Sequence, residues 1–433
     1  MTNKERKAKV YHADLWGLRE KKYAWLSEHG CETTGWQEIQ PRTEFYLFVP
    51  QDTEVLERYN QFVKVTDIFP VNSVGIVTSR DRFVFDFDRE VLKRRIRTFL
   101  DPNLPEDVVR ETFKLRDSHA WSLKKARQAI GQDKNWEDKI VRCLYRPFDV
   151  RWLFYHSAVI ERGREEVMRH MLAGENLALL VSRQVVSDFR HALVAEDVTN
   201  FNNIDVAGRF GSGYQFPLYL YPVTDWRDLL THETAERRPN LNPVVVSALA
   251  HAYGQKPFPE EIFHYIYAVL YAPTYREKNA QFLKIDFPKI PFTVDFELFK
   301  ALSALGKQLV DVHLLRSSEL DPPIVRFQGK GDDILRTGKK NLRYDLDTQR
   351  VYINPGQYFE GVSPQVWEYR IGGYQVCHKW LKDRKDRLLS LDEIRTYCHI
   401  VTALARTIDI QSSIDELYPN VEEKLFPIEL TDV

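Results

Sequence analysis

The stretch that decides the fold is VRCLYRPFDVRWLFYH, residues 141–156. Its two halves, VRCLYRPFDV and RWLFYH, are rich in β-branched and aromatic residues, which favour strands. Further strand candidates follow before residue 222, namely NLALLVSRQ, HALVAED and YQFPLYLYP. One helix, around REEVMRHML, interrupts them. The sequence therefore predicts a β-rich part over about residues 141–222.

The residues before this part predict alternating strands and helices. KVYHADLW indicates a short strand, and GLREKKYAWLSEHG indicates a helix closed by Gly30. FYLFVPQD predicts a strand, TEVLERYNQF a helix, and VGIVTSRDRFVFDFD a β-rich segment. From Arg89 the period becomes helical, with an apolar face and a basic face. The apolar face holds Leu92, Ile96, Phe99 and Leu100, and the basic face holds Arg89, Lys93, Arg94 and Arg97.

The second half of the chain predicts mainly helices. The polar segment TDWRDLLTHETAERRPNLNP is the best linker candidate. Helical patterns follow in residues 259–273, 295–315 and 391–408, and a small β segment is predicted around residues 348–376. We therefore predict an α+β fold, in which a mixed β-rich lobe precedes a mainly helical lobe with a small β segment.

Composition limits the classes of protein that remain. The chain has 433 residues with a net charge of -1, and its pI of about 6.9 is low for a basic nucleic-acid module. Any nucleic-acid site must therefore be locally basic. Four scattered cysteines without C-x-x-C spacing indicate a reducing cytoplasm. Neither a secretion signal nor a membrane span is indicated, because no long apolar run occurs.

Motifs for nucleotide or methyl-donor chemistry are missing. GRFGSGYQF, residues 208–216, contains neither a P-loop nor G-x-G-x-x-G before a helix, so it predicts a turn that leads into a strand. INPGQYF shares only Asn-Pro with the Asn-Pro-Pro-aromatic loop with which methyltransferases hold a flipped base amine. The catalytic centre of a methyltransferase is therefore absent from this sequence.

A metal-dependent nuclease is the next alternative. Asp86 and Asp88 would share one face of a strand and could hold a metal together. The alternative is a carboxylate pair at the N-terminus of the basic helix, where acids are favoured. Cys377–His378 and Cys398–His399 lack the usual spacing of zinc ligands.

Arginine and lysine gather in three places: residues 80–97, residues 142–190 and HKWLKDRKDR near the C-terminal end. The second place uses arginine alone among aromatic residues, and guanidinium groups bind phosphate or guanine through two contacts. The alternative is that these arginines are solvated or form ion pairs, such as those along REEVMRH.

Several strings together resemble a known family. They are VYHADLWGLREKKYAWL, FYLFVPQD, YRPFDVRWLFYH with REEVMRHM, FNNIDVAGRFGSGYQFPLYLY, IYAVLYAPTYREKNAQFLKIDFPKIPF and IGGYQVCHKWLKDRKDRLLSLDEI. From about Val10 to Pro419 the chain resembles the C-terminal specificity part of type ISP restriction–modification enzymes. More loosely, it resembles other single-chain restriction–methylation proteins with a γ-type adenine methyltransferase.

The resemblance implies a target recognition domain that a nuclease, a helicase-like translocase and a methyltransferase precede. Residues 1–40 would hold the trailing strand and helix of the methyltransferase, residues 41–225 the recognition lobe and residues 226–433 the helical lobe. This chain would hold no cofactor, and S-adenosylmethionine and ATP would bind only in missing or partner domains. A split gene or a truncated relative would account for the absence of the nuclease, the translocase and the methyltransferase motifs from this sequence. A sheet edge left open by a split would need a partner.

We therefore expect a cytoplasmic module that recognises a specific double-stranded DNA sequence and directs a methyltransferase and helicase–nuclease partner chain, with no membrane contact. The residues expected to face DNA are Arg146, Arg151, Arg162, Arg164, Arg183, Arg209 and Tyr214. Those expected to hold phosphates are Arg80, Arg82, Lys93, Arg94 and Arg97. The alternatives are a catalytic subunit of an adenine methyltransferase, a divergent nuclease, and a truncated protein-interaction remnant.

Overall fold

The computed structural model describes residues 8–41, 46, 48–50, 53–206, 212–222, 236–338 and 341–430. The chain divides into two compact units, residues 1–60 and residues 61–433.

The first unit holds little secondary structure. Strands β1 (Val10–His12) and β2 (Gln37–Ile39) pair antiparallel, with α1 (Arg19–Glu28) between them in the chain and α2 (Thr53–Tyr59) after them. These elements confirm the strand and helix predicted before Gly30 and the helix predicted for TEVLERYNQF. Half of the residues of FYLFVPQD, for which a strand is predicted, lie outside the described residues, and the described ones, 46 and 48–50, form no strand.

The first unit also leaves apolar surface uncovered. Helix α1 contains no buried residue. Large apolar side chains of this unit are exposed: Tyr11, Trp16, Leu18, Tyr23, Leu26, Trp36, Tyr46, Phe48 and Val49. A surface this rich in aromatic and apolar side chains is typical of a segment that packs against something else.

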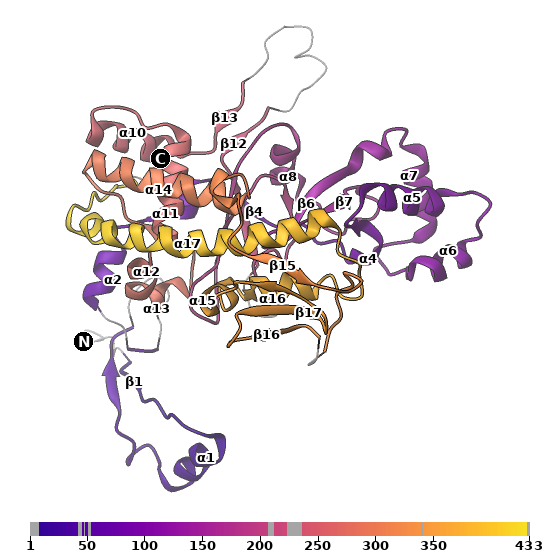
Figure 1. The fold of residues 1–433 in the computed structure, drawn as a ribbon. Coiled ribbons are helices and arrows are strands. Elements are labelled where there is room, and N and C mark those ends of the chain that lie inside the picture. The colour runs from indigo at the N-terminus through magenta and orange to yellow at the C-terminus, as the bar shows by residue number, and fades with distance from the viewer. Residues whose placement is uncertain are drawn as a thin grey trace, which may run out of the picture. The chain divides into compact units, whose positions relative to one another are not determined.

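Two four-stranded sheets form the middle of the second unit (Figure 1). The first has the order β10–β6–β7–β5, with β10 parallel to β6 and the other pairs antiparallel. Its strands are β10 (Val198–Thr199), β6 (Ile140–Arg146), β7 (Asp149–Phe154) and β5 (Phe85–Asp86). The second is antiparallel with the order β4–β11–β8–β9. Its strands are β4 (Ser73–Val74), β11 (Gly213–Pro217), β8 (Ala178–Ser182) and β9 (Ala192–Ala195).

Close backbone approach joins the two sheets. Ile76 donates to the carbonyl oxygen of Thr199 at 2.8 Å and accepts from the Phe201 amide at 2.8 Å. A Cβ on Gly213, the first residue of β11, would lie 1.9 Å from Oδ1 of the buried Asn203. Any larger residue where the strand begins would therefore force the Asn203 side chain to move.

A helical layer covers the first sheet. Helices α5 (Arg89–Leu100), α6 (Glu106–Phe113) and α7 (Leu123–Gln132) share one apolar core with β5, β6 and β7. The α5 residues in this core are Leu92, Ile96 and Phe99, which confirms the predicted apolar face. Helix α8 (Glu165–Leu172) lies where REEVMRHML predicts a helix.

The β-rich prediction for VGIVTSRDRFVFDFD is wrong in its middle. Helix α4 (Asp81–Val84) interrupts the strands there, because the carbonyl oxygen of Arg80 accepts from the amides of Phe83 and Val84.

Four long helices pack together in the second half of the chain. They are α10 (Pro243–Tyr253), α11 (Pro259–Tyr271), α14 (Phe296–His313) and α17 (Leu391–Glu423), with the short α12 (Pro273–Lys278) and α13 (Ala280–Leu283) beside them. Helix α11 is buried on all sides from Ile262 to Tyr271. It crosses α14 at Gly306, where a Cβ would lie 1.9 Å from the carbonyl oxygen of His264.

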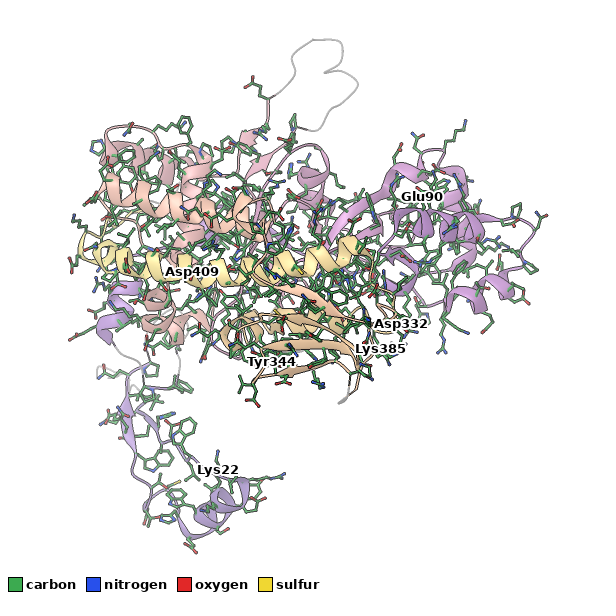
Figure 2. All side chains as sticks on the ribbon, in the orientation of Figure 1. Lys22, Glu90, Asp332, Tyr344, Lys385 and Asp409 are labelled. Carbon is green, nitrogen blue, oxygen red and sulfur yellow. The ribbon has the colours of Figure 1, made fainter. Side chains whose placement is uncertain are left out.

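A third antiparallel sheet packs against α17, in the order β15–β18–β17–β16. Its strands are β15 (Arg326–Gly329), β18 (Gln357–Glu360), β17 (Arg350–Asn354) and β16 (Arg343–Asp345). The Phe359 ring lies 4.3 Å from the Tyr397 ring of α17. Leu335 exchanges backbone hydrogen bonds with Asp386 and Arg387, so Asp332 and Lys385 lie close together in Figure 2.

The remaining described elements are short: α3 (Val65–Ile68), η1 (Trp136–Lys139), η3 (Ser318–Leu320), α15 (Pro364–Trp367), α16 (Val376–Lys382), and the strand pairs β3 (Val63–Lys64) with β14 (Lys289–Ile290), β12 (Tyr219–Leu220) with β13 (Arg238–Pro239), and β19 (Arg370–Ile371) with β20 (Tyr374–Gln375).

The α+β class and the small β segment are confirmed. The lobe boundary at residues 225/226 stays a prediction, and the proposed linker falls mostly outside the described residues. Within the part of the chain that the structure describes, no helix is both long and apolar enough to cross a membrane.

Candidate nucleic-acid interface

Arg80 is a fixed, half-buried cation. Its guanidinium group stacks over the Trp121 ring at 4.0 Å and donates to the carbonyl oxygens of Thr78 and Val159, both at 3.3 Å. Burial lowers the pKa of Arg80, and the Glu161 carboxylate partly offsets this effect. The group still carries its charge at neutral pH, because arginine loses its proton only in strong base.

A pocket of about 490 Å³ lies beside this turn and is termed the Arg80 pocket. It is lined by Ser79–Phe83, Phe113–Arg116, Ser118 and Glu161. Arg82 and Arg116 are exposed and form no ion pair with a described carboxylate, whereas Lys114 pairs with Glu111 at 3.3 Å. This pocket therefore presents positive charge that is free to bind an anion.

Sequence reasoning missed Lys114 and Arg116, which line the Arg80 pocket, and Trp121, which stacks on Arg80. They lie in FKLRDSHAW, where basic residues stand between a Phe and a Trp, and that composition could have identified them. Lys114 ends α6 in a left-handed conformation with a φ of 53°.

The segment after β7 returns to the same turn. Arg162 and Val77 exchange backbone hydrogen bonds of 2.9 and 3.1 Å, and the Ser79 hydroxyl group contacts the Glu161 carboxylate. Arg162 is exposed, and Arg164 precedes α8 with a φ of 57°. The structure thus brings four predicted residues into one region: Arg80, Arg82, Arg162 and Arg164.

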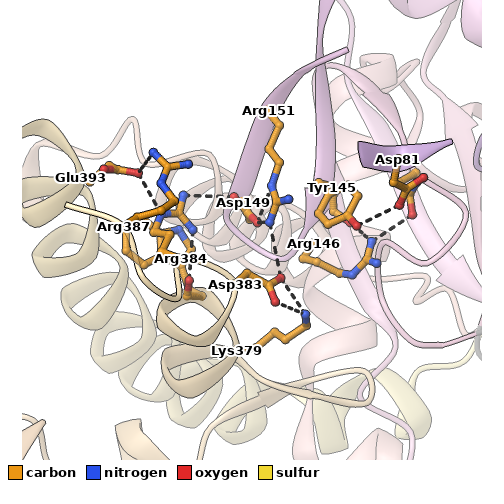
Figure 3. Close-up of polar contacts among 12 residues, drawn as sticks. Asp81, Tyr145, Arg146, Asp149, Arg151, Lys379, Asp383, Arg384, Arg387 and Glu393 are labelled. Carbon is orange, nitrogen blue, oxygen red and sulfur yellow. Dashed lines mark hydrogen bonds and ion pairs between the residues drawn. The ribbon is translucent and has the colours of Figure 1, made fainter. Parts of the chain in front are cut away.

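Arg146 and Arg151 lie in the interior on either side of one ring (Figure 3). Their guanidinium groups lie 4.0 and 3.9 Å from the centre of the Tyr145 ring. The Tyr145 hydroxyl group donates to Asp81 at 2.9 Å, and burial raises the pKa of Tyr145 to about 12. Arg146 is only 9% exposed and donates to Asn200 at 2.9 Å.

Arg151 also belongs to a network of buried charges, which Figure 3 draws. It donates to Asp149 at 2.6 Å, and Arg384 donates to the other oxygen of that carboxylate at 3.1 Å. Burial alone would raise the pKa of Asp149, but the two guanidinium groups outweigh it and lower the pKa. Arg384 also contacts Glu393 at 3.2 Å. This network ties the β6–β7 turn to α16 and α17.

Arg183 and Tyr214 form a second group of predicted residues. The register of β8 and β11 places Tyr214 opposite Val181. Arg183 pairs with Asp286 at 3.0 Å, and the Tyr214 ring lies 4.8 Å from the Phe287 ring. Arg209 lies outside the described residues.

Helix α5 carries the third group. Lys93 and Arg97 both pair with Glu137, at 2.6 and 2.7 Å, and these contacts lower the pKa of Glu137. Arg94 is exposed and has no ion-pair partner among the described residues.

The carboxylate pair has structural roles. The Asp88 carboxylate accepts from the amides of Glu90 and Val91 at 2.7 and 3.0 Å and so caps α5, while Asp86 pairs with Arg95. The described residues contain no group of three or more His, Cys, Asp or Glu side chains that could hold a metal ion. The capping interpretation is thus confirmed for Asp88 but not for Asp86, and the nuclease interpretation finds no support.

Solved structures with a similar fold include three that are complexes with DNA or a DNA mimic. One is a cryo-EM structure of a DrdV–DNA complex, with a TM-score of 0.71 and 21% identity over 94% of this chain and 43% of that chain. Another is a nuclease-deletion mutant of the type ISP enzyme LlaGI with a DNA substrate mimic, with a TM-score of 0.66 and 18% identity over 95% of this chain and 33% of that chain. The third is the ATP-dependent type ISP enzyme LlaBIII bound to DNA, with a TM-score of 0.65 and 17% identity over 88% of this chain and 25% of that chain. This chain spans less than half the length of each.

The sequence matches no curated protein significantly. Residues 67–412 match the model of the type ISP C-terminal specificity domain. The match covers most of the chain and includes the Arg80 pocket, the buried network, and β8 and β11. The chain therefore belongs to the family of type ISP C-terminal specificity domains.

Proposed function

We propose that this chain is the DNA-recognition module of a restriction–modification system and binds one short double-stranded sequence in preference to others. The match to a specificity domain over residues 67–412 carries this proposal. The DrdV and LlaBIII structures are described as complexes with DNA, and the LlaGI structure as a complex with a DNA substrate mimic.

The arrangement of arginines supports a division of roles. Phosphate contacts set the position of a protein on DNA, whereas contacts to base edges specify the sequence. The Arg80 pocket and the exposed face of α5 would hold phosphates, because their free cations are Arg82, Arg116 and Arg94. The base-reading residues would be Arg162, Arg164, Arg183, Arg209 and Tyr214.

Arg146 and Arg151 would act from beneath this surface. Arg146 is 9% exposed, the side chain of Arg151 is 12% exposed, and both guanidinium groups stack on Tyr145. Their hydrogen bonds fix β6 and β7, and we expect them to support the recognition surface rather than to touch a base.

The remaining activities would come from a partner chain or from a longer form of this protein. A methyltransferase, a translocase and a nuclease would act there, with S-adenosylmethionine and ATP as their cofactors. The exposed apolar side chains of the first unit, such as Trp16 at 82% exposure, support a docking role. A cytoplasmic location also belongs to this proposal.

The test is selection from a pool of randomised duplexes with the purified chain, followed by titration of the selected sequence and a scrambled control at physiological salt. The expected result is one enriched sequence that binds about 10³-fold or more tightly than the control. Equal affinity for all duplexes would contradict the proposal.

A second measurement separates recognition from catalysis. Labelled S-adenosylmethionine and the selected duplex are incubated with the chain alone, and no methyl transfer is expected. Transfer by the chain alone would place the catalytic centre here and overturn the division of activities.

A further inference from the structure

A second arginine-lined pocket lies apart from all predicted residues. Its volume is about 510 Å³, and its lining includes Arg190, Arg276, Arg370, Tyr369, Asp188 and Glu277. Arg190 precedes β9, Arg276 lies in α12 and Arg370 begins β19. Three guanidinium groups from distant parts of the sequence therefore converge on one space, which is termed the Arg276 pocket.

The Arg276 side chain is held in place but not saturated. Its Nε donates to the carbonyl oxygen of Leu270 at 2.6 Å, and its guanidinium group lies 4.6 Å from the centre of the Tyr271 ring. Its Nη2 is buried without a hydrogen-bond partner. A buried donor on a charged group costs stability when it stays unpaired, so this guanidinium group keeps hydrogen-bonding capacity that the protein does not use.

The other two arginines are fixed through their backbones and keep their charge available. The Gly372 amide donates to the carbonyl oxygen of Arg190 at 2.7 Å, which ties Arg190 to the hairpin that carries Arg370. Both side chains are exposed, and neither forms an ion pair with a carboxylate in the described part of the chain.

The acids of this pocket do not cancel its charge. Asp188 pairs at 3.4 Å with Lys284, which does not line the pocket. The three guanidinium groups outnumber the two carboxylates of the lining. A planar guanidinium group binds two oxygens of a phosphate at once.

We propose that the Arg276 pocket binds a phosphate group through Arg190, Arg276 and Arg370. A DNA backbone and a free phosphate ester offer the same oxygens to this pocket. The choice of DNA as the source of the phosphate therefore rests on the proposed function. The expected source is the DNA backbone, which would give the recognition module an anchoring point in addition to the Arg80 pocket.

The test uses the full chain and the double variant R190Q/R370Q, which changes two exposed side chains and leaves the anchored Arg276 intact. R395Q is the matched control, because Arg395 is an exposed arginine with no ion pair in the described residues. It lies four and a half turns of α17 from Gln411, which lines the pocket.

The first probe is inorganic pyrophosphate, titrated by calorimetry. Wild type and R395Q should bind it, and R190Q/R370Q should bind it about tenfold or more weakly. The second probe is the selected duplex at several salt concentrations. The slope of log affinity against log salt is negative, and its magnitude should be smaller by about 0.9 in the double variant if one backbone phosphate contact is lost.

The outcomes are distinct. Loss of pyrophosphate binding with an unchanged DNA slope identifies a free phosphate ester as the ligand. A smaller slope identifies the DNA backbone, whether or not pyrophosphate binds measurably. No difference between wild type and double variant with either probe overturns the pocket, even when wild type selects one DNA sequence. If wild type selects none, the proposed function fails and the pyrophosphate result alone decides the pocket.

Discussion

Two regions of the second unit use the same residue type in opposite ways. Around Asp149, two guanidinium groups are buried and paired, and the side chains of Asp149 and Arg384 are 1% and 5% exposed. In the Arg80 pocket, Arg82 and Arg116 are exposed without an ion pair to a described carboxylate. Arginine therefore stabilises the fold in one region and offers charge to a ligand in the other. Which role an arginine has depends on whether the fold brings a carboxylate from a distant part of the sequence next to it.

The largest effect should come from breaking the buried network. Asp149→Ala leaves Arg151 and Arg384 without their shared carboxylate, and removal of one partner of a buried ion pair costs about 3–5 kcal/mol. We expect urea denaturation to show this loss in the free energy of unfolding. Asp347→Ala, at an exposed carboxylate, is the control and should leave stability unchanged. An Asp149→Ala protein as stable as wild type would mean that the network does not join the elements.

The next effect concerns base reading by Arg183. Arg183→Gln should relax discrimination at one position of the selected sequence by about 1–3 kcal/mol, or about 5- to 150-fold. The fold should survive, because Lys64 still pairs with Asp286 at 2.9 Å. Competition with single-base variants of the duplex measures the effect, with Lys256→Gln as control. Uniformly weaker binding at all positions would instead make Arg183 a phosphate contact.

Substitutions in the Arg80 pocket should lower DNA affinity and leave stability unchanged, whereas Asp149→Ala should lower stability. Arg82→Gln combined with Arg116→Gln should weaken binding about tenfold for selected and scrambled duplexes alike, and lower the salt slope by about 0.9 for each phosphate lost. Thermal stability should not change, because both side chains are exposed. Arg326→Gln is the control. A loss of stability without a loss of affinity would remove the difference between the two regions.

The buried region should also respond to pH. His313 packs against Phe148, its Nδ1 contacts the Tyr267 hydroxyl group at 2.6 Å, and burial and then Arg276 lower its pKa to about 3. The unfolded chain binds this proton below about pH 6.5, so stability should fall as pH drops from there toward 3, by up to about 1.4 kcal/mol per pH unit. His313→Gln should have a smaller slope of unfolding free energy against pH than wild type, and His119→Gln, at an exposed site, should keep the wild-type slope. Equal slopes in all three proteins would refute this account.

Sequence patterns predicted the helices and strands more accurately than the contacts between them. The periodicity of Leu92, Ile96 and Phe99 correctly predicts the buried face of α5, and β6 and β7 form where β-branched and aromatic residues gather. Local patterns succeed here because α5 buries one face at a helical period and the strands are rich in residues that favour β structure.

The candidate site was harder to predict because its contacts are not local. Asp149 and Arg384 are 235 residues apart in sequence, and the stacking of Trp121 on Arg80 joins two separate elements. Nothing in YRPFD indicates that its arginine would be buried while Arg82 stays exposed. Residue type predicted the chemistry, whereas only the fold reveals which arginines are already paired.

The smallest effect tests whether the basic face of α5 binds DNA, as proposed for the exposed arginines, or only forms ion pairs within the protein. Glu137→Gln releases Lys93 and Arg97 beside Arg94, and should raise affinity for any duplex about twofold at low salt if α5 faces DNA. Arg94→Gln should lower that affinity by a similar factor. High salt should abolish both changes, because the charges of Arg94 and Arg97 are exposed and screened. Affinity unchanged by either substitution would exclude α5 from the interface, since DNA bound there must respond to the charge of this face.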